Sequence, residues 1–269
     1  MTTARTSLDR LERYYDAVPR ASARAEDFGP LTLFVRETPG WPYYARPTPG
    51  RPGPAATAED VDRVRARQRV LGVPEAFEWV AEVTPGLRGA VEASGLRVHE
   101  HPLMVRDEDA PLPGPHPLVR LLGPDDPLLA SALAVPHLAF AAPGTALGEA
   151  GPAELTAETA ARAADVPAAA DRIRAGRTVL AAAVEDGGAL CSGMHLPVGD
   201  VTEIAGVGTL PSARRRGLGL AVTAALVADA TARGVRTVFL SAGDDDVARI
   251  YARLGFRRVA TALIAEPPE

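Results

Sequence analysis

The chain has 269 residues, of which 46% are hydrophobic, and a formal net charge of -5 at pH 7. This length allows one large domain or two of ordinary size, and the apolar content excludes an intrinsically disordered protein. The negative charge argues against a protein whose main task is to hold nucleic acid, because such domains are usually basic.

The chain contains one cysteine, Cys191, which excludes an internal disulfide and fits a reducing compartment. Residues 1–18 lack the apolar segment of a signal peptide. No uninterrupted apolar stretch reaches the roughly 18 residues of a membrane span. We therefore expect a cytoplasmic protein with no membrane partner.

The stretch RDEDAPLPGPHP, residues 106–117, is acidic and then rich in proline, so neither a helix nor a strand can continue through it. It predicts an N-terminal domain of residues 1–106, a linker of residues 107–117 and a C-terminal domain of residues 118–269. Expected helices in the first half are 8–17, 57–72 and 85–95. Expected strands are 31–37, 41–45, 77–83 and 96–105.

The second half begins with one or two alanine-rich helices, predicted over residues 156–175. A hairpin over 177–196 is predicted to turn at Asp186-Gly187-Gly188. The remaining elements are expected as strands over 201–210, 236–242 and 256–265 and helices over 218–233 and 246–254.

The two halves echo each other, since AVEASGLRV in the first corresponds to IYARLGFRRV in the second, with Gly95 in the place of Gly255. The shared element order favours a duplicated fold, although so short a similarity also arises by chance.

The segment TLPSARRRGLGLA, residues 209–221, sets three arginines ahead of two glycines at a predicted helix start. Unpaired N–H groups at such a start suit a pyrophosphate, and glycine lets the backbone approach it closely. The segment lacks the lysine of a P-loop and the spacing of a dinucleotide fingerprint. Taken alone, the Gly217-x-Gly219 spacing is a weak signal, and a glycine-rich turn with solvated arginines is the better interpretation.

Two sequence signatures favour the phosphate cradle over the solvated turn. Residues 214–219, RRRGLG, resemble the R/Q-x-x-G-x-G/A signature of the GNAT superfamily of acyl-CoA-dependent N-acyltransferases. Residues 244–256, DDDVARIYARLGF, resemble its second signature, N-x-x-A-x-x-x-Y-x-x-x-G-F. The resemblance implies an α/β protein of two GNAT-like domains, each a mixed, mostly antiparallel central sheet flanked by helices.

The same resemblance implies acetyl-CoA as co-substrate and no metal. Backbone groups of Val207, Gly208 and Thr209 would bind the acyl carbonyl and the pantetheine arm. The pyrophosphate would be held by backbone amides of Arg214, Arg215, Arg216, Gly217, Leu218, Gly219 and Leu220. The arginine side chains would reach the outer phosphates, where charge-assisted hydrogen bonds are strong.

Amide formation needs an uncharged amine and a proton for the departing thiolate. By the resemblance, Glu203 would deprotonate the amine, although it is equally an ordinary strand carboxylate. Tyr251 would protonate the thiolate, and its alternative role is aromatic packing. Asp244 stands where the family has asparagine, so it would contact coenzyme A or else cap the following helix.

Four other side chains carry weaker signals. His99 and His101 are predicted on one strand face, but no third ligand has metal spacing, so we expect a surface pair. Cys191 and His195 would lie about 13 Å apart on a strand, too far for a nucleophile and its base.

The first half is predicted to be a degenerate GNAT-like domain that binds no coenzyme A. The prolines of residues 46–54 leave few amide donors, and Val91 falls where Tyr251 falls. Glu78 and Trp79 either line an acceptor pocket or belong to the core and its edge. The arginines of the helix over 57–72 are expected on its solvated faces: Arg63, Arg65, Arg67 and Arg69.

We expect an N-acyltransferase that moves an acetyl group to a primary amine by direct attack, because no convincing nucleophile for a covalent intermediate is present. The alternative is a non-catalytic module of the same fold that senses acyl-CoA or another ligand, and a third possibility is a structural scaffold. The acceptor is expected to be a small-molecule or peptide amine, with no nucleic-acid partner.

Overall fold

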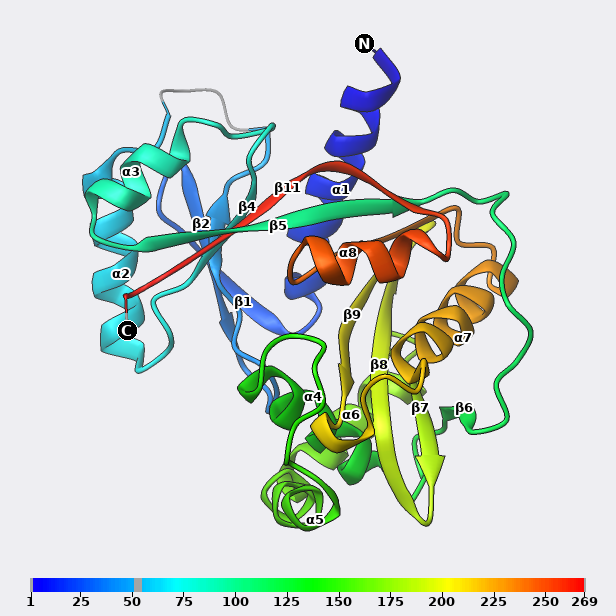
Figure 1. The fold of residues 1–269 in the computed structure, drawn as a ribbon. Coiled ribbons are helices and arrows are strands. Elements are labelled where there is room, and N and C mark those ends of the chain that lie inside the picture. The colour runs from blue at the N-terminus through cyan, green and yellow to red at the C-terminus, as the bar shows by residue number, and fades with distance from the viewer. Residues whose placement is uncertain (1, 51–54, 269) are drawn as a thin grey trace. The chain divides into compact units, whose positions relative to one another are not determined.

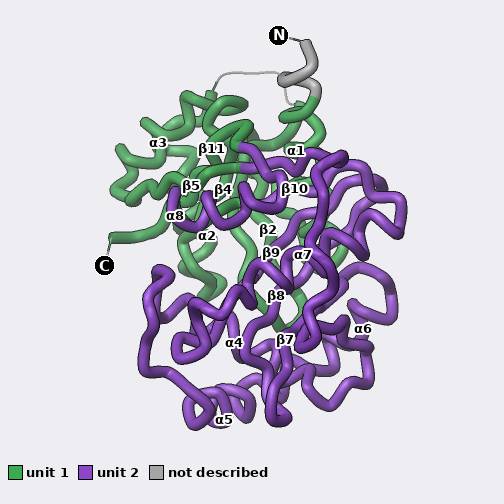
Figure 2. Tube along the Cα trace, turned by 45° about the vertical axis from the view of Figure 1, so that its right-hand side comes forward, with its two compact units in different colours: residues 1–103, 241–244, 258–269 green, residues 104–240, 245–257 purple. Residues whose placement is uncertain are grey.

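A computed structural model describes residues 2–50 and 55–268 (Figure 1). The chain forms two compact units (Figure 2). Unit 1 comprises Met1–Leu103, Ser241–Asp244 and Arg258–Glu269, and unit 2 comprises Met104–Leu240 and Asp245–Arg257. The sequence did not indicate that the C-terminal segment joins unit 1. The division expected at residues 107–117 stays a prediction.

Unit 1 is a sheet covered by helices. Its strands follow the order β1-β2-β3-β4-β11-β5. Neighbouring strands pair antiparallel at β1–β2, β2–β3 and β4–β11, and parallel at β3–β4. The strands are β1 (Ala23–Asp27), β2 (Leu31–Arg36), β3 (Ala45–Pro47), β4 (Phe77–Val80), β5 (Arg97–Arg106) and β11 (Phe256–Glu266), the last two mostly in this unit. The helices are α1 (Thr2–Arg20), α2 (Ala58–Leu71) and α3 (Leu87–Ala93).

The core of unit 1 lies between α2, α3 and the sheet. Val61 and Val64 of α2 and Val91 of α3 are fully buried against it. Trp79 is 2% exposed and belongs to this core. Of its two predicted roles, pocket lining and core packing, the structure therefore supports core packing. The capping signal at the start of α2 is confirmed, because Thr57 N–H donates to Asp60 Oδ2 at 2.8 Å.

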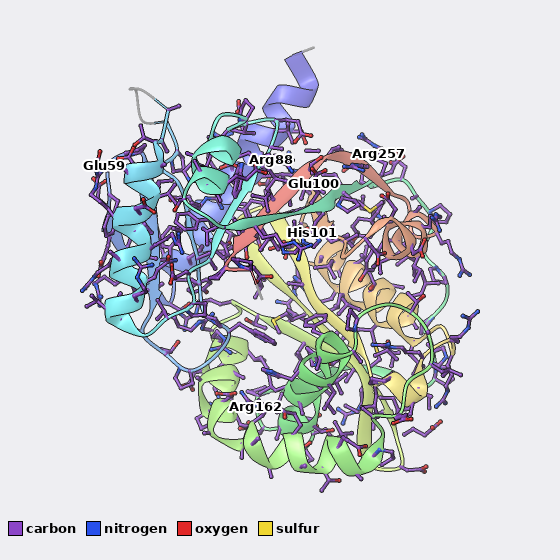
Figure 3. All side chains as sticks on the ribbon, turned by 60° about the vertical axis from the view of Figure 1, so that its left-hand side comes forward. Glu59, Arg88, Glu100, His101, Arg162 and Arg257 are labelled. Atoms are coloured by element: carbon purple, nitrogen blue, oxygen red, sulfur yellow. The ribbon has the colours of Figure 1, made fainter. Side chains whose placement is uncertain are left out.

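The arginines of α2 are not simply solvated. Arg65 is only 16% exposed, and its Nε donates to Glu75 Oε2 at 2.6 Å. The expectation of solvated faces is wrong for this residue because its guanidinium joins α2 to the segment before β4. A further ion pair of unit 1 joins Arg88 of α3 to Glu100 of β5 at 2.6 Å, and Figure 3 labels both residues.

Unit 2 is a sheet with the strand order β10-β9-β8-β7-β6, antiparallel except for the β9–β10 pair. The predicted hairpin, strands and helices of the second half are confirmed. The strands are β6 (Val119–Leu122), β7 (Val179–Glu185), β8 (Gly188–Val198), β9 (Val201–Thr209) and β10 (Thr237–Ser241). The helices are α4 (Leu129–Ala141), α5 (Pro152–Ala161), α6 (Val166–Arg174), α7 (Leu218–Ala232) and α8 (Asp245–Ala252).

Helix α4 was not predicted, and it packs on β8 and β9. It contains Pro136, which has no N–H to donate to the carbonyl of Ala132 one turn earlier. The hydroxyl of Ser192 on β8 donates to that carbonyl at 2.6 Å. The helix therefore tolerates its proline because the sheet supplies the missing donor.

No helix within residues 2–50 and 55–268 combines the length and the apolar character needed to span a membrane.

Candidate functional site: a splayed strand pair and an amide cradle

Strands β9 and β10 separate partway along their length. Their parallel pairing runs from Val201 opposite Thr237 to Glu203 opposite Phe239, although β9 continues to Thr209. On its other edge β9 carries a bulge against β8, and Gly206 takes φ +62° within it. A bulge bends its strand and increases the local twist, so it accounts for the separation. The far half of β9 thus presents backbone groups that β10 does not pair.

The loop after β9 leads into the start of α7. Arg215 takes φ +64° and Gly217 takes φ +76°, which turn the chain before the helix begins at Leu218. Within the described part of the chain, the backbone N–H groups of residues 215–220 have no hydrogen-bond partner. Consecutive free N–H groups at the positive end of a helix dipole form an anion cradle, so these residues fit a diphosphate.

The three arginines of this loop point to different partners. Arg214 donates to backbone carbonyls at the end of α4 and beyond it. Arg216 makes a bidentate ion pair with Glu185, with N–O distances of 2.7 and 3.0 Å. Arg215 is exposed and, among the described residues, has no side-chain partner. This differs from the expectation that all three side chains reach outer phosphates, because two of them are engaged with the protein.

Tyr251 lies on α8 and is 9% exposed. Burial raises the pKa of its hydroxyl well above the ordinary value, the nearby Cys191 raises it further, and a hydrogen bond with Thr223 partly opposes both. The phenol therefore stays protonated at neutral pH. Thr223 in turn donates to the carbonyl of Gly219 at 2.8 Å, and Thr209 donates to Cys191 Sγ at 3.3 Å. Tyr251 thus shares neighbours with both the cradle and the end of β9. Its ring also meets Phe256 edge-on at 6.1 Å, so the packing role is present too.

Glu203 is half-buried at the point where the pairing of β9 and β10 ends. Its neighbour Thr202 faces α7, because it contacts His195 and His195 contacts Asp229 on that helix. Successive side chains of a strand point to opposite faces, so Glu203 faces the α4 side of the sheet. Tyr251 lies on the α7 side, where it meets Thr223.

A buried histidine network that sequence reasoning missed joins β8, β9 and α7. His195 is fully buried, with Nδ1 3.0 Å from Thr202 Oγ1 and Nε2 2.9 Å from Asp229 Oδ2. Burial lowers the pKa of His195 against the opposing effect of Asp229. The neutral ring donates from Nε2 to the carboxylate and accepts from Thr202 at Nδ1. Burial alone would raise the pKa of Asp229, but hydrogen bonds from Arg233 and His195 outweigh it and lower that pKa.

Cys191 has no part in that network. It is fully buried, and burial raises the pKa of its thiol to about 12. This thiol is therefore not a nucleophile at neutral pH, in keeping with the sequence interpretation.

The remaining sequence candidates lie elsewhere. His99 is 3.5 Å from Glu266, and His101 Nδ1 is 3.0 Å from the carbonyl of Gly243, both within unit 1. Residues 2–50 and 55–268 contain no group of three metal-ligating side chains. Asp244 directly precedes α8, at the position of a helix cap. Of the proline-rich segment 46–54, residues 51–54 lie outside the described residues.

Residues 180–264 match the family described as FR47-like protein. A GCN5-related N-acetyltransferase from Kribbella flavida is similar over 97% of this chain and 96% of its own, with 25% identity and a TM-score of 0.68. No curated protein matches the sequence.

Two more distant structures share the fold. A GCN5-related N-acetyltransferase from Sphaerobacter thermophilus has 18% identity and a TM-score of 0.53, over 90% of this chain and 82% of its own. A tandem GNAT protein from the clavulanic acid biosynthesis pathway has 17% identity and a TM-score of 0.52, over 89% and 79%.

Proposed function

We propose that the chain is a GNAT-type N-acyltransferase that moves an acyl group, acetyl in the simplest case, from coenzyme A to a primary amine. One observation carries the proposal. The free main-chain amides of residues 215–220 and the protonated phenol of Tyr251 lie in one unit and are linked through Thr223 and Gly219.

Donor binding is assigned to the backbone. The amides of residues 215–220 hold the diphosphate. The far half of β9, from Val207 to Thr209, which β10 leaves unpaired, holds the pantetheine arm and the acyl carbonyl. When bound, acetyl-CoA supplies a thioester carbonyl that an amine attacks directly. These contacts are made by main-chain groups fixed in place beforehand, so little reorganisation is required at the moment of reaction.

Two side chains move the protons. Glu203 accepts a proton from the incoming ammonium group on the α4 side of the sheet, through water, because about 10 Å of strand separates it from the bulge. Tyr251 donates its proton to the departing thiolate on the α7 side. Placing the two groups on opposite faces keeps the base from taking the proton of the acid.

The remaining parts of the proposal concern partners and the first half. We propose a small-molecule or peptide amine as acceptor and a cytoplasmic location. Unit 1 is proposed to bind no coenzyme A, since Val91, which corresponds to Tyr251, is fully buried in its core.

The test is release of free thiol from acetyl-CoA in the presence of a panel of primary amines, including polyamines, aminoglycosides, amino acid amides and peptides. The proposal predicts amine-dependent release with at least one acceptor. Coenzyme A binding without release by any amine would favour the ligand-sensing module instead.

A further inference from the structure

The segment that joins α4 to α5, residues 142–151, is fastened to the loop that follows β9. Gly148 N–H donates to the Pro211 carbonyl at 3.1 Å, and Ser212 N–H donates to the Ala150 carbonyl at 3.0 Å. The approach is close, because a Cβ on Gly148 would lie 2.9 Å from Cβ of Pro211. This contact leaves no room for a larger side chain at position 148.

Arg214 adds a second attachment to the same segment. Its Nη2 donates to the carbonyls of Ala139 and Ala142 at 3.0 and 2.5 Å, and its Nη1 donates to that of Ala146 at 3.1 Å. The last carbonyls of a helix lack helical donors and carry partial negative charge, so a guanidinium suits the end of α4. The Arg214 side chain thus caps the C-terminus of α4 and also binds the start of residues 142–151.

The main chain of Arg214 stands at the opposite end of this connection. It comes directly before the free amides that begin at residue 215. Any ligand that fixes the cradle also fixes the backbone from which the guanidinium extends. The other two arginines make no such link, because Arg216 pairs with Glu185 on β7 and Arg215 is exposed.

We propose that Arg214 is a positioning residue, which couples the cradle to residues 142–151 so that a ligand bound at the cradle orders this segment. The segment follows α4, the helix on the face of the sheet that carries Glu203. In the proposed function, on which this inference rests, that is the side from which the amine approaches. Arg214 thereby prepares the acceptor side of the site when the donor is bound, without touching either substrate.

The experiment is hydrogen exchange of residues 142–151 with and without saturating coenzyme A, combined with calorimetric measurement of coenzyme A affinity. In the unmodified protein, coenzyme A is expected to slow exchange of this segment by about tenfold. Arg214→Met is expected to keep coenzyme A affinity within about threefold and to lose that protection. The matched control, Arg215→Met, is expected to weaken binding but to keep the protection at saturation.

Equal protection in Arg214→Met and the unmodified protein would overturn the inference. Should Arg214→Met fail to fold, Arg214→Lys keeps the charge but lacks the planar guanidinium that reaches several carbonyls at once, and it is expected to lose most of the protection as well. If the unmodified protein binds coenzyme A and its segment stays unprotected, the inference alone fails. If it binds no coenzyme A, the proposed function fails too.

Discussion

The hydroxyl of Thr209 donates a hydrogen bond to the buried thiol of Cys191 at 3.3 Å. This contact joins the end of β9, where the acyl carbonyl is proposed to bind, to the surroundings of Tyr251, whose hydroxyl Cys191 influences directly. The proposed acid is therefore buried beside the place proposed for the thioester. Burial disfavours the charged form of both groups, so it raises the pKa of a thiolate formed beside Tyr251 as well as that of the phenol, and the proton can pass between them.

Tyr251→Phe is expected to lower kcat for thiol release by about a hundredfold or more, because it removes the proton donor for the leaving group. Coenzyme A affinity is expected to stay the same, since the donor contacts are assigned to main-chain groups. Tyr14→Phe is the matched control, because Tyr14 is a 2% exposed tyrosine of unit 1. Unchanged turnover in Tyr251→Phe would assign this residue to packing against Phe256.

Glu203→Gln tests the base. The substitution keeps the shape of the side chain and removes its capacity to accept a proton, so we expect kcat/KM for the amine to fall by about ten- to a hundredfold. The loss is expected to be largest at low pH, where more of the amine is protonated. Glu100→Gln on β5, which breaks an exposed ion pair with Arg88, serves as control and is expected to have little effect. Equal rates in the two variants would make Glu203 an ordinary strand carboxylate.

Gly208→Ala tests the packing of α4 on β9. An added Cβ would lie 2.8 Å from Cβ of Ala139 and 3.0 Å from Cα of Pro136, so the helix has to move. We expect the free energy of unfolding to fall by about 1–3 kcal/mol and coenzyme A affinity to fall with it. Gly89→Ala, in exposed space on α3, is expected to be neutral or stabilising by up to ~1 kcal/mol. Urea unfolding of both variants measures the two free energies of unfolding. It shows whether a loss comes from crowding at position 208 or from replacing any glycine by alanine.

The buried histidine predicts a pH dependence of stability. Burial keeps the pKa of His195 in the folded protein below its ordinary value, so between pH 6.5 and that lowered pKa only the unfolded chain takes up the proton. The free energy of unfolding therefore falls as pH drops through this window, by at most about 1.4 kcal/mol per pH unit. His195→Asn is expected to be less stable at pH 7 and to have a shallower dependence below pH 6.5. Denaturant unfolding at several pH values measures both slopes, and equal slopes would place the titrating group elsewhere.

Local sequence rules predicted most elements because their signals are local. Thr57 and Asp60 mark the start of α2, and the hairpin turn at Asp186 and Gly187 has the positive φ angles that its sequence favours. Helix α4 was missed because it is apolar on nearly every face and contains a proline, so it shows no amphipathic period. Strand β11 was predicted as a strand, but a strand pattern does not name its partner, and its pairing with β4 was not foreseen.

The same limit applies within the site. The amide cradle follows from main-chain geometry that a glycine-containing loop before a helix imposes, so residues 215–220 could be proposed from the sequence. The direction of the Arg214 side chain depends on carbonyls about 70 positions earlier in the chain. His195 on β8 and Asp229 on α7 are separated by 34 positions. No spacing rule links residues that meet only through tertiary packing.

The most direct test of the account is calorimetric titration of the unmodified protein with coenzyme A and, in parallel, with pantetheine, which lacks the diphosphate and the nucleotide. If the free amides at the start of α7 hold the diphosphate, coenzyme A binds and pantetheine binds at least about a hundredfold more weakly, a difference of ~2.7 kcal/mol. Equal affinities, or no binding of coenzyme A, would contradict the assignment of this loop as the donor site.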